Sequence, residues 1–108
     1  MPSLSDWHEF AVRVGTVTRA EPNEAARDPA IALWIDFGPL GVKQSSAKIT
    51  DRYAPGDLVG RQVVAVTGFP PLRVGGFRSD VLVVGALTDG GVVLLAPDAE
   101  VAPGSEIA

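Results

Sequence analysis

The sequence predicts a single all-β domain whose short strands form a small barrel. Its 108 residues fit one domain, because compact domains most often contain about 100 to 150 residues. Hydrophobic residues make up 46% of the chain and charged residues 20%, which suits a folded protein rather than a disordered one. Twelve glycines and nine prolines separate short runs rich in Val and Ile, a pattern typical of many strands joined by tight turns.

Three strands are expected in the first half of the chain. Residues 9–19 alternate apolar side chains with others, and Gly15 is expected at a bend or bulge. The clearest alternation covers residues 31–37 and predicts one face in the core and one face outside it. The turn at residues 38–41 then leads into a short third strand over residues 42–45.

One short helix and further strands are expected in the second half. Residues 46–53 lack alternation, so a helix of about two turns is predicted there, capped by Ser45 or Ser46 and ending before Pro55. The last two strands are joined by an Asp-Gly sequence, which is a hairpin signal. The strands of this half are expected at residues 61–66, 81–87 and 92–96.

Five principal strands with a single helix between the third and the fourth form the arrangement of the OB-fold, a five-stranded Greek-key barrel. Such a barrel binds ligands across strands 2 and 3 and through the loops that join strands 1 and 2 and strands 4 and 5. Here those loops are residues 20–29 and 68–80. SH3-like barrels and small sandwiches have the same density of strands, so topology alone leaves them open.

The residue types favour a binding protein over an enzyme. Cysteine is absent, which excludes disulfides, thiolate nucleophiles and cysteine-based metal sites. His8 is the only histidine, so a Ser-His-Asp triad or a histidine metal cluster cannot form within one chain. No phosphate-binding loop or dinucleotide-binding fingerprint occurs. We therefore expect neither catalysis nor a cofactor nor a bound metal.

The expected compartment is the cytoplasm. The first nine residues have neither a basic start nor an apolar segment, so no secretory signal is predicted. The longest apolar runs are far shorter than the roughly 20 residues that span a bilayer, so no integral membrane association is expected.

The net charge of −4 is distributed unevenly along the chain. Residues 43–78 carry six basic and two acidic residues, whereas residues 79–108 carry five acidic residues and no basic one. Proteins that bind nucleic acid usually present an excess of Lys and Arg, so only the middle third is a candidate for that role. In so short a chain, chance explains such an asymmetry equally well.

Motifs that suggest a family lie in five segments of the chain, residues 10–17, 34–38, 43–53, 60–66 and 69–79. Together they resemble the tRNA-binding domain shared by free-standing tRNA-binding proteins, by the C-terminal part of many methionyl-tRNA synthetases and by CsaA-type protein-export chaperones. Within that family, the similarity to the CsaA type is carried by Lys43-Gln44-Ser45-Ser46-Ala47 and Phe69-Pro70-Pro71.

The resemblance implies an OB-fold homodimer of the cytoplasm that acts as a secretion chaperone and binds unfolded precursor proteins. It also implies two further candidate partners, tRNA and an export motor. Binding of tRNA in place of precursor proteins is the alternative function.

The resemblance and the loop chemistry together give a set of candidate ligand-binding residues. In the loop of residues 68–80, basic residues alternate with aromatic ones, as in proteins that bind single strands or loops of nucleic acid. The same aromatic rings would equally suit contacts to an unfolded peptide, or would simply plug the end of the barrel. The candidates are Lys43, Gln44, Ser45, Ser46, Phe69, Arg73, Phe77, Arg78 and Ser79.

A dimer interface is expected from apolar residues outside the barrel strands. A barrel of this size buries only about two-thirds of the surface of its unfolded chain, and stable homodimer interfaces are apolar and symmetric. The residues expected to contribute are Trp7, Phe10, Val101 and Ile107.

Overall fold

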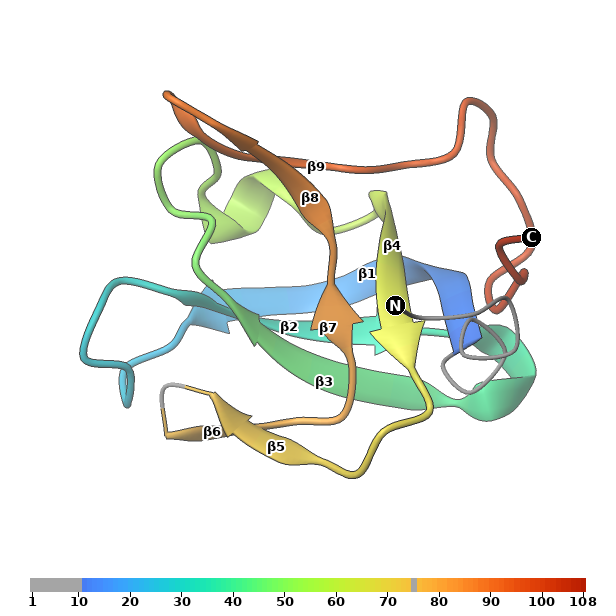
Figure 1. Ribbon diagram of the computed structural model, residues 1–108, viewed down its shortest axis with the longest axis horizontal. Helices are drawn as coiled ribbons and strands as arrows, with labels where there is room; N and C mark the ends of the chain where they lie inside the picture. Colours follow the sequence, from blue (N-terminus) through green and yellow to red (C-terminus); the bar gives the residue numbers. More distant parts are fainter. Residues whose placement is uncertain (1–10, 75) are drawn as a thin grey trace, which may run out of the picture.

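The computed structural model describes residues 11–74 and 76–108 (Figure 1). Regular structure in these two ranges consists of strands and two short 3-10 turns. No helix among the described residues is long and apolar enough to cross a membrane. Trp7, His8 and Phe10 lie outside the described residues.

A five-stranded antiparallel sheet in the order β3-β2-β1-β4-β7 curls into a nearly closed barrel, which confirms the predicted OB-fold (Figure 1). Its strands are β1 (Ala11–Pro22), β2 (Ile31–Asp36), β3 (Val42–Ala47), β4 (Gln62–Thr67) and β7 (Leu82–Val83). Two hairpins complete the fold, β5 (Leu72–Val74) with β6 (Phe77–Ser79) and β8 (Gly85–Thr88) with β9 (Gly91–Leu94).

The long strand β1 changes partners along its length. Residues 11–16 pair with β4, and residues 16–22 pair with β2. The register with β2 shifts between Val17 and Arg19, so the irregularity lies beyond the position expected for it, Gly15. Gly15 serves close packing instead, because a Cβ there would lie 2.5 Å from Cγ2 of Ile35.

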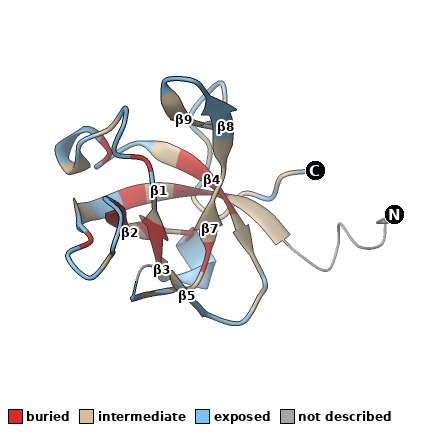
Figure 2. Ribbon diagram, turned by 60° about the vertical axis from the view of Figure 1, so that its left-hand side comes forward, coloured by how far each residue is buried: buried red, intermediate tan, exposed pale blue. Residues whose placement is uncertain are grey.

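The core lies inside the sheet and follows the predicted alternation of β2. Ile31, Leu33 and Ile35 are at most 1% exposed, and Figure 2 shows buried residues along the barrel strands. Burying an aliphatic side chain of this size stabilises a fold by roughly 1.5 to 3 kcal/mol. Leu58 from the segment before β4 and Val81 from the segment before β7 complete this cluster.

The two-turn helix predicted for residues 46–53 is wrong. Ser45 and Ser46 are not helix caps, because both belong to β3 and pair with β2. Between β3 and β4 the helical structure is the 3-10 turn η2 (Pro55–Asp57). The alternation is lost because the chain after β3 turns inward, with Ile49 buried at 3% exposure.

The segment after β4 also differs in detail from the prediction. The strand expected at residues 81–87 is divided into β7 and β8, and Val84 between them donates a 2.9 Å backbone hydrogen bond to Val64. The predicted Asp-Gly hairpin is present, since Thr88 pairs with Gly91 at its tip.

The chain beyond β9 returns to the beginning of β1 (Figure 1). The backbone N–H of Val14 donates to the carbonyl of Ser105 at 2.9 Å, and that of Gly104 donates to Val14 at 2.7 Å. A third bond runs from the N–H of Ile107 to the carbonyl of Val12 at 2.8 Å. We call residues 101–107 the C-terminal strap; it packs on the turn η1 (Gly38–Leu40) as well as on β1.

Candidate functional site

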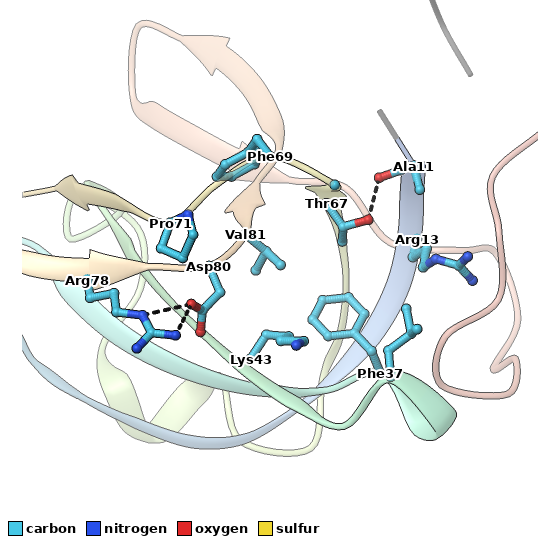
Figure 3. Close-up of a pocket in the computed structure, with 12 residues that line it drawn as sticks. Ala11, Arg13, Phe37, Lys43, Thr67, Phe69, Pro71, Arg78, Asp80 and Val81 are labelled. Carbon is cyan, nitrogen blue, oxygen red and sulfur yellow. Dashed lines mark hydrogen bonds and ion pairs between the residues drawn. The ribbon is translucent and has the colours of Figure 1, made fainter. Parts of the chain in front are cut away.

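A pocket of about 430 Å³ opens at one end of the barrel, and we call it the barrel-end pocket (Figure 3). Its lining comes from the first residues of β1, from β3, and from the segments that leave β4 and β6. Small-molecule and peptide-anchor sites are commonly concave spaces of about 300 to 1,000 Å³ with apolar walls and a few polar groups. The pocket has both the size and the composition of such a site.

Apolar side chains form opposite walls of the barrel-end pocket. Phe37, which is fully buried, lies on one side, and Phe69 and Pro71 from the loop after β4 lie on the other (Figure 3). Val81 lies between these two walls. Phe69 was expected either to contact a ligand or to fill the end of the barrel. It lies at the opening of the pocket and lines it.

Two of the basic side chains that line the pocket already have acidic partners. Arg13 Nη2 lies 3.3 Å from Glu106 Oε1, and Arg13 Nη1 donates to the carbonyl of Gly104 at 2.8 Å. Arg78 Nη2 lies 3.0 Å from Oδ1 of Asp80. Both guanidinium groups are thus held by groups of the protein itself.

Lys43 differs from these two arginines. It lies in β3 opposite Ile35, so its side chain starts on the inner face of the sheet. Figure 3 shows it lying across the pocket between Asp80 and Phe37. Its ammonium group has no ion pair or hydrogen bond within residues 11–74 and 76–108. Among the described residues, Lys43 is therefore the basic group of the pocket without an acidic partner.

Three of the nine candidate residues, Lys43, Phe69 and Arg78, line the barrel-end pocket. Gln44 and Ser46 instead attach the β5–β6 hairpin to β3. The Nε2 of Gln44 donates to the carbonyl of Arg78 at 2.7 Å, and the backbone N–H of Ser46 donates to the hydroxyl of Ser79 at 3.0 Å.

The three candidate serines are buried. Ser45 and Ser79 are fully buried, and Ser46 is 5% exposed. Their side chains are buried in this chain, and direct contact with a ligand stays a prediction for all three. The hydroxyl of Ser79 accepts the hydrogen bond from β3, and the hydroxyl of Ser46 accepts one from Nδ2 of Asn23 at 2.9 Å. The buried hydroxyl of Ser45 has no hydrogen-bond partner among the described residues.

The remaining two candidates, Arg73 and Phe77, lie on the hairpin away from the pocket lining. Phe77 packs edge-on against Trp34 of β2, with ring centroids 5.7 Å apart and an interplanar angle of 88°. Arg19 of β1 lies over the same indole, with Cζ 4.3 Å from the ring centroid. We call Arg19, Trp34 and Phe77 the outer-face stack. Arg73 is exposed and donates to the carbonyl of Gly76 at 3.0 Å.

Sequence reasoning did not single out Trp34 or Arg19. A signal for Trp34 was present, because it occupies an outward position in the most regular alternating strand, where a polar residue is usual. Arg19 gave no signal of its own. Its position over the indole follows from the shifted register of β1 beside β2, which places it opposite Trp34.

The expected dimer residues stay a prediction. Val101 and Ile107 are half-buried within their own chain, where the N–H of Val101 donates to Oε1 of Gln62 at 3.0 Å. Trp7 and Phe10 lie outside the described residues. Among the residues that are described, no group of three or more His, Cys, Asp or Glu side chains is placed to hold a metal ion.

Solved structures similar to this chain include two CsaA chaperones. The chaperone CsaA from Bacillus anthracis is 54% identical, with a TM-score of 0.93 over 100% of this chain and 99% of that one. The CsaA chaperone protein from Picrophilus torridus is 40% identical, with a TM-score of 0.92 over the whole of both chains. The similarity to CsaA that the motifs suggested is thereby confirmed.

Family and sequence comparisons agree with this. The methionine–tRNA ligase of Porphyromonas gingivalis is 36% identical over 106 residues, which are 97% of this chain and 15% of the ligase. The chain therefore spans about one-seventh of the length of that relative. Residues 12–106 match the family model described as "Putative tRNA binding domain". Because this match covers most of the chain, the protein belongs to the tRNA-binding domain family.

Proposed function

We propose that this protein is a CsaA-like secretion chaperone that binds unfolded precursor proteins and catalyses no reaction. Its support is the similarity, over the whole chain, to two proteins named as CsaA chaperones. The observation that carries the proposal is the barrel-end pocket of about 430 Å³, whose accessible apolar lining comes from Leu40, Phe69 and Pro71. Unfolded chains expose apolar side chains that folded proteins bury, and such a pocket offers them an alternative site.

In this proposal the protein acts in the cytoplasm as a homodimer, without a cofactor and without inserting into a membrane, and passes precursors to an export motor. The proposal of a homodimer rests on the resemblance to the CsaA type and on the apolar residues expected outside the barrel strands.

Binding of tRNA is the second candidate function, and the outer-face stack favours it. Aromatic rings beside arginine provide a surface on which unstacked bases pack, and the exposed Arg73 lies in the same hairpin as Phe77. The similarity to methionine–tRNA ligases supports the same candidate.

The experiment that tests the chaperone proposal measures aggregation of a chemically denatured client by light scattering, with no nucleotide present. We expect the wild-type protein to suppress aggregation and Phe69→Ala to reduce the suppression, because the variant removes one apolar wall of the pocket. Val59→Ala is the matched control, since Val59 is 53% exposed and does not line the pocket.

Three results would contradict the proposal. The first is suppression that depends on ATP after contaminating chaperones have been removed. The second is equal suppression of aggregation by Phe69→Ala and Val59→Ala, which would indicate that the client binds outside the pocket. The third is binding of labelled tRNA without any binding of unfolded client. In that case Arg73→Ala should weaken tRNA binding and lower the salt slope by about 0.7 to 0.9 for each phosphate that the variant no longer neutralises.

A further inference from the structure

We propose that the barrel-end pocket selects polypeptide segments in which a carboxylate lies next to an apolar side chain, and that Lys43 recognises the carboxylate. This inference rests on the proposed function, because it names the class of segment that the same pocket accepts. Its chemical basis is the contrast between a pocket wall that is mostly apolar and one cationic group that the described chain does not neutralise.

The charge available in the pocket is smaller than its lining suggests. Arg13 is paired with Glu106 and Arg78 with Asp80, at 3.3 and 3.0 Å. Because the side chains of Glu106 and Arg78 are 71% and 64% exposed, each pair is weak and a ligand could exchange with it. The two carboxylates still balance the charge of both guanidinium groups, which leaves Lys43 as the net positive charge among the described pocket residues.

Lys43 has no acidic partner of this kind among the described residues. The comparison with Lys48, five residues later, is direct: Lys48 Nζ lies 3.0 Å from Oδ2 of Asp28, and its side chain is 66% exposed. Lys43 is less exposed, lies between Asp80 and Phe37, and forms no ion pair within the described ranges. An ammonium group beside apolar walls gains from a partner anion, because water solvates it less completely there.

The walls of the pocket determine which side chain can lie next to the bound carboxylate. The apolar lining that is open to a ligand comes from Leu40, Phe69 and Pro71, since Phe37 and Val81 are at most 1% exposed. Phe69 and Pro71 lie across the opening from Lys43 (Figure 3). A carboxylate at the ammonium group therefore places its neighbouring side chain between aromatic and aliphatic surfaces. An apolar neighbour is stabilised there by burial, whereas a polar one would lose water without gaining a hydrogen bond.

The charge distribution favours a peptide over RNA at this pocket. Arg13 and Arg78 are balanced by Glu106 and Asp80, so the described pocket residues and their ion-pair partners leave a single net positive charge, that of Lys43. Tight binding of a phosphate backbone uses several Lys or Arg side chains at once. A single carboxylate needs only one cation.

The carboxylate can be an Asp or Glu side chain or the C-terminal group of the client, because Lys43 would recognise either. The test uses fluorescence anisotropy with short unfolded peptides in matched pairs. One pair differs by Glu or Gln next to an internal Phe. The second pair ends in Phe and differs by a free acid or an amide at the C-terminus.

We expect the carboxylate member of at least one pair to bind the wild-type protein about tenfold more tightly, as for a charge-assisted hydrogen bond. The pair that responds identifies the source of the carboxylate. Lys43→Gln should abolish the difference within that pair. Lys48→Gln removes the same charge from the protein. It should leave the difference in affinity within the pair unchanged, because Lys48 is paired with Asp28 and does not line the pocket.

The outcomes separate this inference from the proposed function. Equal binding of both members of both pairs by the wild-type protein would overturn the inference while leaving the pocket a peptide site. No binding of any peptide would overturn the proposed function. If Lys43→Gln weakens binding of labelled tRNA and has no effect on peptides, the cation belongs to an RNA site and the inference is wrong. The comparison within wild-type protein remains decisive even if Lys43→Gln does not fold.

Discussion

Asp80 and Gln44 are joined by two hydrogen bonds. The backbone N–H of Asp80 donates to the carbonyl of Gln44 at 2.8 Å, and the backbone N–H of Gln44 donates to Oδ2 of Asp80 at 3.3 Å. Oδ1 of the same carboxylate accepts from Arg78 at 3.0 Å. One side chain thus attaches the edge of β3 to the β5–β6 hairpin and fixes one wall of the barrel-end pocket.

We expect Asp80→Ala to lower the free energy of unfolding by about 1 to 3 kcal/mol, since it leaves the Gln44 N–H and the Arg78 guanidinium without an acceptor. Urea unfolding followed by circular dichroism measures the change. Asp98→Ala serves as the control, because Asp98 is exposed and should cost no more than about 0.5 kcal/mol. Equal stabilities for the two variants would show that the seam does not depend on this carboxylate.

The packing of the C-terminal strap on η1 can be separated from backbone strain with two glycines. Gly38 has φ 62°, and a Cβ there would clash with the carbonyl oxygen of Pro103; Gly41 has φ 83° and open space around it. Gly41→Ala should therefore cost only backbone strain, about 1 to 3 kcal/mol, because φ 83° with ψ −170° is a conformation essentially restricted to glycine. Gly38→Ala should cost more, because it adds the clash with Pro103 to the strain of a positive φ. Thermal unfolding of both variants gives the comparison. If their melting temperatures fall equally, the C-terminal strap does not pack closely against η1 in solution.

The outer-face stack gives a spectroscopic prediction. In a Trp7→Phe background Trp34 is the remaining tryptophan, and its emission reports the packing of Phe77. Phe77→Ala should shift the emission to longer wavelength and lower the free energy of unfolding by about 0.5 to 3 kcal/mol, because the burial of the ring and its edge-on packing are removed. Leu72→Ala, in β5 of the same hairpin and 48% exposed, is the control. An unchanged spectrum would mean that the hairpin does not cover the indole in solution.

Light scattering tests the expected homodimer. We expect a mass twice the 11.2 kDa of one chain at micromolar concentration. Trp7→Glu should shift the equilibrium toward the monomer, because a charge in an apolar interface loses its hydration. Thr50→Glu, at an exposed uncharged residue, controls for the added charge. A monomer mass for the wild-type protein would refute the dimer.

The parts of the fold that sequence predicts well are those where side chains repeat with the period of the backbone. The pattern predicts strand β2 almost to the residue because Ile31, Leu33 and Ile35 alternate with outward positions. The predicted helix is wrong because Ser45 and Ser46 favour a helix cap locally, whereas pairing with β2 holds them in a strand. Tertiary pairing thus overrides a local preference.

The sequence predicts the composition of the candidate site but not its geometry. Lys43, Phe69 and Arg78 come together because the barrel brings β3 beside the loop after β4, a long-range contact that local patterns do not encode. The pairing of Arg78 with Asp80 is equally hidden, although the two residues are close in sequence. A basic patch counted along the chain therefore overstates the charge that a ligand can use.

The hydrogen bonds between the C-terminal strap and β1 cannot form until the strap has been synthesised. Val12 and Val14 are among the first described residues, yet their partners Gly104, Ser105 and Ile107 leave the ribosome about 90 residues later. Until then, one edge of the nascent strand exposes unsatisfied peptide groups, which attract other chains. Closure must also bring together residues about 90 positions apart, a separation that slows folding. A protein proposed to bind unfolded chains is therefore itself an incompletely folded chain until its C-terminal strap has been synthesised.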